Sequence, residues 1–116
     1  MKKLLYVCIM LLTVATVNAN LEQVENKLDA IMNQASNNPT LANKLYDVLE
    51  NSAKSFWIGE FPSKQEYLKN AKNSDERRGA FIRLLNDSKD RIVSFLKKIG
   101  NEDDQKEVID ALVKLV

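Results

Sequence analysis

The chain has 116 residues, with 17 basic and 16 acidic side chains, no histidine and a single cysteine, Cys8. The absence of histidine excludes a Ser-His-Asp triad, a Cys-His nucleophile and a histidine-bound zinc site. Because the net charge is close to zero, no overall electrostatic field favours binding to nucleic acid or to an anionic membrane.

The first residues have the pattern of a secretory signal peptide. Two lysines follow Met1, an apolar stretch runs from Leu4 to Val17, and the small Ala19 offers a cleavage site. The alternative is an uncleaved membrane anchor, but a membrane-spanning helix needs about 20 apolar residues, more than this stretch provides. We therefore expect a signal peptide over 1–19, no stable membrane anchor after cleavage, and a secreted or periplasmic protein.

Cys8 lies inside this apolar stretch. It does not fit a lipoprotein signal, because Val7 is too large for the preceding position and the cysteine comes before the apolar stretch ends. The remaining chain, 20–116, then has no cysteine, so it forms no disulfide and offers no thiolate ligand. Its length suffices for a single domain with one modest hydrophobic core.

Apolar residues recur at helical spacing through the first half of this domain. We predict a first helix over 20–35, capped by Asn20 and Gln23. Asn38 then caps a second helix with Pro39 in its first position, where a missing N–H costs nothing. The buried face of this second helix is predicted to contain Leu41, Leu45, Val48 and Leu49.

The sequence of the second half of the domain predicts three further helices. A capping box at Ser63–Glu66 begins a short one, with Pro62 and Tyr67 arranged as a hydrophobic staple. Asn73 or Ser74 caps the longest pattern, which ends at Gly100. Apolar residues on its buried face are Phe81, Leu84, Leu85, Ile92, Phe95, Leu96 and Ile99.

Asn101 begins the last helix, and its predicted buried residues are Val108, Ala111, Leu112 and Leu115. No stretch alternates with period two for the length of a strand, and no repeat or linker interrupts the domain. The sequence therefore predicts an all-α fold, a small compact bundle of four to five helices with short connections.

Three short patterns resemble catalytic or metal sites but lack essential parts. Ser94–Lys97 matches S-x-x-K without the other motifs of serine acyl-transferases. Glu60 and Glu66 flank Pro62 but have structural explanations, as a turn residue and a capping residue. Residues 102–104 are acidic but lack the ligand spacing of a calcium loop. We therefore expect no enzyme, no catalytic residue, no metal and no cofactor.

The aromatic residues gather in the stretch 55–67, and basic residues gather in the long helix. Trp and Arg side chains dominate the energy of protein interfaces. We therefore expect a non-catalytic protein that binds a protein partner, with Trp57, Ile58, Phe61, Arg77 and Arg78 as binding residues. The alternative for the charges is structural, because Arg83, Asp87 and Arg91 have the spacing of an ion-pair ladder.

A second hypothesis is a carrier of a small apolar ligand. Its cavity would be enclosed by the rings of Phe56, Trp57, Phe61, Phe81 and Phe95. Against this, a hollow core costs stability, and the domain has no disulfide to offset it. The sequence leaves open whether the Trp57 ring points into the core or out to solvent, and of the two we expect the inward orientation.

Overall fold

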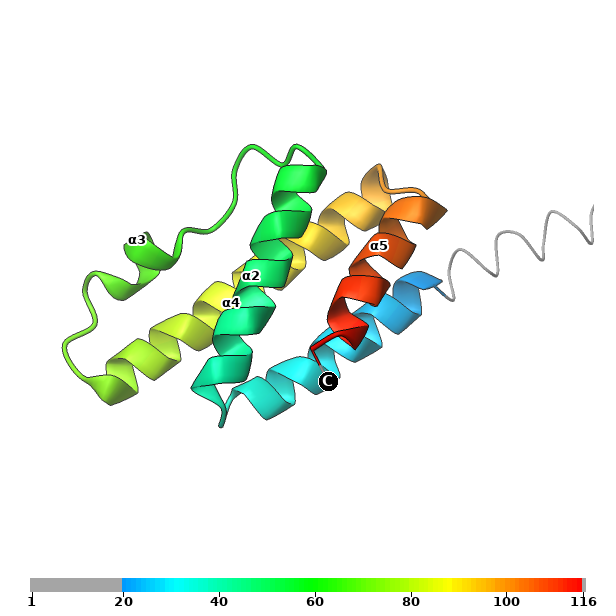
Figure 1. Ribbon diagram of the computed structural model, residues 1–116. Coiled ribbons are helices and arrows are strands. Elements are labelled where there is room, and N and C mark those ends of the chain that lie inside the picture. The colour runs from blue at the N-terminus through cyan, green and yellow to red at the C-terminus, as the bar shows by residue number, and fades with distance from the viewer. Residues whose placement is uncertain (1–19, 116) are drawn as a thin grey trace, which may run out of the picture.

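The computed structural model describes residues 20–115, which are helical or irregular and contain no strand (Figure 1). The predicted signal peptide and Cys8 lie outside the described residues. Five helices follow one another within these residues, which confirms the predicted all-α bundle. They are residues 20–35, α2 (Pro39–Ser55), α3 (Lys64–Leu68), α4 (Ser74–Lys98) and α5 (Glu102–Val113).

Asparagine side chains begin three of these helices, as predicted. Asn38 Oδ1 accepts the Leu41 N–H at 3.2 Å, and Asn73 Oδ1 accepts the Glu76 N–H at 2.8 Å. At α5 the bond is reciprocal, because Asn101 and Asp104 each accept the other's backbone N–H in a full capping box. These local bonds set where α2, α4 and α5 start. Asn20, the first described residue, is itself helical, so it does not stand at the N-cap position predicted for it.

The core is formed where α2 lies across α4, with α5 and the helix 20–35 completing it (Figure 1). The helix 20–35 runs antiparallel to α4, because Lys97 pairs with Glu25 at 3.2 Å and Lys89 pairs with Asp29 at 3.3 Å. Most predicted core positions are buried. They include Leu28, Leu41, Leu45, Leu49, Leu84, Leu85, Ile92, Leu96, Val108 and Leu112.

Two predictions about the long helix are wrong. Ile99 is 75% exposed, because α4 ends at Lys98 and Ile99 has left the helical face. The predicted ladder through Asp87 does not form either, because Asp87 Oδ2 instead accepts a hydrogen bond from the Tyr67 hydroxyl. This bond attaches α3 to α4. Within the described chain, the ion pairs of Asp87 with Arg83 and Arg91 are absent.

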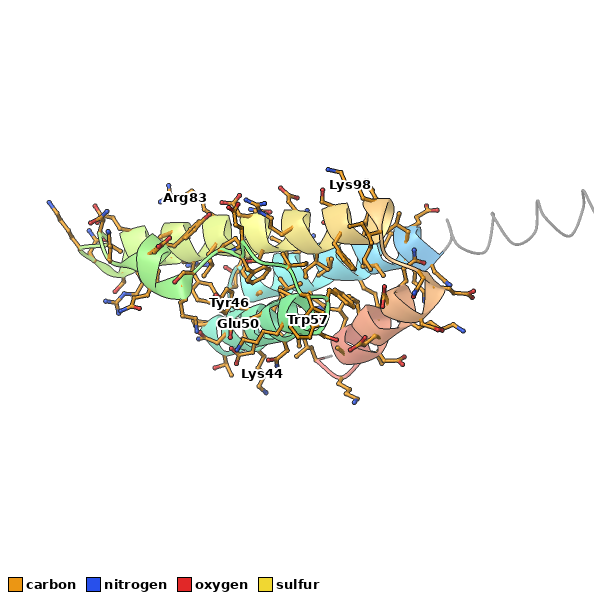
Figure 2. All side chains as sticks on the ribbon, turned by 90° about the horizontal axis from the view of Figure 1, so that it is seen from above. Lys44, Tyr46, Glu50, Trp57, Arg83 and Lys98 are labelled. Carbon is orange, nitrogen blue, oxygen red and sulfur yellow. The ribbon has the colours of Figure 1, made fainter. Side chains whose placement is uncertain are left out.

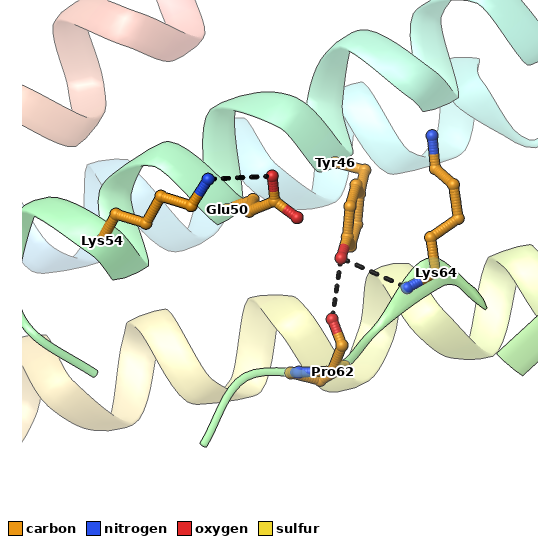
Figure 3. Close-up of polar contacts among 5 residues, drawn as sticks. All are labelled: Tyr46, Glu50, Lys54, Pro62 and Lys64. Atoms are coloured by element: carbon orange, nitrogen blue, oxygen red, sulfur yellow. Dashed lines mark hydrogen bonds and ion pairs between the residues drawn. The ribbon is translucent and has the colours of Figure 1, made fainter. Parts of the chain in front are cut away.

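The predicted capping box of α3 is also wrong. Ser63 stands at the N-cap position, but its side chain makes no capping hydrogen bond. The buried Tyr46 of α2 takes its place (Figure 3). Its hydroxyl donates to the Pro62 carbonyl oxygen at 2.8 Å and accepts the Lys64 N–H at 3.3 Å. The connection from α2 to α3 is therefore held by a residue of α2 and not by a cap of its own.

Replacing this tyrosine tests its role. Tyr46→Phe keeps the ring but leaves a carbonyl and an N–H without their partner, so the free energy of unfolding should fall by about 1–2 kcal/mol. Urea denaturation followed by circular dichroism measures the change. Tyr67→Phe is the matched control, because it removes one exposed hydrogen bond and should cost less. Equal stability of Tyr46→Phe and the unsubstituted protein would contradict this role.

The same hydroxyl predicts a dependence on alkaline pH. Burial raises the pKa of Tyr46 above its ordinary value of 10.0, so the folded protein holds this proton more tightly than the unfolded chain does. The stabilisation is complete below pH 10.0 and is lost as the pH rises through the folded-state pKa. Unfolding free energies measured across this range should therefore fall more steeply for the unsubstituted protein than for Tyr46→Phe. Parallel pH profiles would refute the assignment.

Candidate protein-binding surface

Trp57 occupies a left-handed turn that ends α2. Its N–H donates to the Lys54 carbonyl oxygen at 3.3 Å, and the Ile58 N–H donates to the Ala53 carbonyl oxygen at 2.9 Å. This pair of bonds is the Schellman motif, whose left-handed position is usually filled by glycine. Trp57 fills it here with φ 59°, and it is the one residue with positive φ in the described chain. A side chain in this conformation costs about 1–2 kcal/mol relative to right-handed backbone.

The Trp57 side chain is 92% exposed, so the prediction that its ring points into the core is wrong. Its neighbours occupy the inward positions instead. The Phe56 ring stacks on the Phe95 ring of α4, with 4.8 Å between centroids and 9° between planes. Ile58 packs against the core from the other side of the turn. The turn thus has a rigid apolar base and presents the indole to solvent.

A second exposed apolar residue stands at the end of α4, one turn after Phe95. Ile99 follows the last turn of α4, and its N–H donates to the carbonyl oxygen of Phe95, the residue whose ring carries Phe56. In Figure 1, the ends of α2 and α4 and the start of α5 all lie toward the top of the view, and Figure 2, seen from above, labels Trp57. We call Trp57 and Ile99, with the half-buried Phe56, Ile58 and Phe95 below them, the Trp57 surface.

The charged residues around the Trp57 surface have mixed signs. Lys54 precedes the turn and pairs with Glu50 at 3.6 Å, while Ser55 donates from its hydroxyl to Glu107 of α5 at 3.2 Å. Glu60 lies exposed just beyond the turn. A surface with an apolar centre and a polar rim is the usual anatomy of a protein interface.

The five predicted binding residues do not form one surface. Trp57 and Ile58 lie in the turn, and Phe61 is half-buried against the Tyr46 ring, 6.2 Å between centroids. Arg77 and Arg78 lie in the first turns of α4, roughly 25 Å along the helix from Phe95 at about 1.5 Å per residue. The aromatic stretch and the basic start of α4, the two regions expected to bind a partner, are therefore separate surfaces.

Arg78 has a structural role at that far end. Its Nε donates to the Ser36 carbonyl oxygen at 2.8 Å and its Nη2 donates to Asn37 Oδ1 at 2.6 Å. These bonds satisfy acceptors at the C-terminal end of the helix 20–35 and join it to α4. Arg77 is exposed and makes no hydrogen bond or ion pair within residues 20–115.

The predicted aromatic shell for an apolar ligand does not form. Phe56 and Phe95 stack on each other, Phe61 packs on Tyr46, and Trp57 faces solvent. Only Phe81 of the five rings lines the cavity described below.

Two of the patterns that resembled catalytic or metal sites can be compared with the structure. Lys97 of the S-x-x-K pattern pairs with Glu25. Among residues 20–115, no three His, Cys, Asp or Glu side chains are grouped closely enough to hold a metal ion. None of the helices in this range is both long and apolar enough to cross a membrane.

The strained turn gives a stability prediction. Trp57→Gly relieves the left-handed strain, whereas Trp57→Ala retains it, so the glycine variant should be the more stable of the two by about 1 kcal/mol. Chemical denaturation measures the stability of both variants. It is followed by far-ultraviolet circular dichroism, because the variants lack the only tryptophan and so have no tryptophan fluorescence to report unfolding. A glycine variant less stable than the alanine variant would show that the backbone here is not strained.

Comparison of the chain with models of protein families, with curated proteins and with solved structures finds no match. The function must therefore be argued from the surfaces of this chain alone.

Proposed function

We propose that this chain is an exported, non-catalytic protein that binds another protein through the Trp57 surface. The observation that carries the proposal is the single tryptophan, held 92% exposed in a left-handed turn. Neither hydrophobic burial nor backbone preference favours tryptophan at this position. Residues that oppose the folding preferences of their site are found most often where function requires them.

The geometry suits a binding anchor. Tryptophan is among the residues most enriched at the energetic centres of interfaces, because it brings a large apolar area with few rotatable bonds. The turn below it is fixed by two backbone hydrogen bonds and by the Phe56–Phe95 stack. Little backbone freedom is then lost on binding, which leaves more of the contact energy for affinity.

The surface also indicates the shape of its partner. The indole is exposed in the turn that ends α2, so the partner should offer an apolar pocket to receive it, and Ile99 should lie against the wall of that pocket. The mixed charges around the turn favour a polar contact rim and not a strongly charged partner. Export, which rests on the signal-peptide pattern, places this partner outside the cytoplasm.

Affinity capture from the protein's native fluid, with identification of the retained protein, tests the proposal. Trp57→Gly should reduce affinity for that partner by about 2 kcal/mol or more, roughly thirtyfold, while the fold is kept. Ile99→Ala should cause a smaller loss.

Val113→Ala is the matched control, because Val113 is also apolar and 48% exposed but lies at the end of α5, outside the Trp57 surface. This variant should bind as the unsubstituted protein does. Undiminished partner binding by Trp57→Gly would reject the Trp57 surface as the interface.

A further inference from the structure

A cavity of about 540 Å³ lies at the opposite end of α4 from Trp57. It opens between the end of the helix 20–35, the start of α2, the short α3 and the first turns of α4. Its walls are largely apolar and are formed by Ala35, Ala42, Leu68, Phe81, Ile82 and Leu85. The volume falls within the ~300–1,000 Å³ of small-molecule sites, which are typically apolar with a few polar groups that fix orientation.

The charged groups of this cavity are mainly cationic. Lys64, Arg77 and Arg78 line it, against the single carboxylate of Asp75. Lys64 is held in place, since its Nζ donates to Asn43 Oδ1 at 2.9 Å and lies 5.5 Å from the Phe81 ring centroid.

The two arginines retain unused hydrogen-bond donors. The bonds of Arg78 to Ser36 and Asn37 use its Nε and Nη2, so the two N–H groups of Nη1 have no partner within the described residues. The whole guanidinium of Arg77 is without a partner in the same part of the chain. An apolar cavity is therefore bordered by guanidinium N–H donors that have no partner within the described residues.

We infer that this cavity binds a small amphiphile with an apolar chain and one carboxylate headgroup, of the medium-chain fatty acid class. The headgroup meets Arg77 and the free Nη1 of Arg78, and the chain lies against Phe81 and Ile82. A carboxylate pairs with a guanidinium in a charge-assisted bond, whereas a cationic amphiphile is repelled by the same groups. Nucleic acid would need a track of cations along a surface and not one cluster beside an apolar cavity.

This inference is independent of the proposed protein partner. The cavity and the Trp57 surface share no residue, and they lie at opposite ends of α4. Either can fail without affecting the other.

Calorimetric titration of the purified protein with decanoate, decanol and decyltrimethylammonium, all below micelle formation, tests the inference. Decanoate should bind at least about tenfold more tightly than the cationic probe, the ratio expected from one charge-assisted hydrogen bond. Amide shifts on adding decanoate should fall on residues 35–43 and 64–85 and spare residues 54–59.

Two matched pairs of variants identify the groups involved. Arg77→Ala should weaken decanoate binding about tenfold. Arg83→Ala should not weaken it, although it removes the same charge from an exposed position on α4 that lies outside the cavity. Ile82→Asp should abolish decanoate binding while Ile82→Lys retains it, because both lose the same apolar contact but only the aspartate repels the headgroup.

The inference is overturned if decanoate does not bind, or if the anionic and cationic probes bind equally. It is also overturned if the amide shifts map to residues 54–59, or if Arg77→Ala and Arg83→Ala lose affinity equally.

Discussion

A buried phenol hydroxyl needs hydrogen-bond partners, and Tyr46 finds both of them in the connection between α2 and α3. That requirement determines the course of the chain after the Trp57 turn. It brings Phe61 against the Tyr46 ring and starts α3 beside α4, where Lys64 can line the cavity. Tyr46 thus holds the segment that leads from the Trp57 turn to α3. A domain without a disulfide depends on such contacts to hold a long irregular segment.

The parts of the fold that follow from short-range rules could be predicted from the sequence. Asn38, Asn73 and Asn101 each cap a backbone N–H three residues away, so the donor and the acceptor are visible together in the sequence. The buried leucines could also be predicted, because they recur at the spacing of one helix face. The start of α3 could not be predicted in this way. Its N–H pairs with Tyr46 of another helix, and the local capping pattern at Ser63 does not form its bond.

The exposure of Trp57 and Ile99 was predicted wrongly for a common reason. Helical periodicity places Trp57 four residues after the buried Ala53, and Ile99 three after the buried Leu96, so both appear to belong to the core. Each lies just beyond the point where its helix ends, and periodicity no longer applies there. For Trp57 the usual signal of such an ending is a glycine in the left-handed position, but Gly59 comes two residues too late. Because tryptophan stands where glycine is usual, the sequence does not indicate the turn.

The residues assigned to binding differ in how much the fold depends on them. The exposed side chains of Trp57, Ile99 and Arg77 make no hydrogen bond or ion pair within residues 20–115, whereas those of Arg78 and Lys64 also hold neighbouring elements together. A small domain has only a few kcal/mol of stability to lose. A substitution of Arg78 or Lys64 could therefore lower the measured affinity by unfolding the domain and not by removing a contact with the ligand. Changes at Trp57 and at Arg77 avoid this problem. Because a continuous helix separates them, their effects on stability should add, and any departure from additivity would reveal coupling between the two ends of α4.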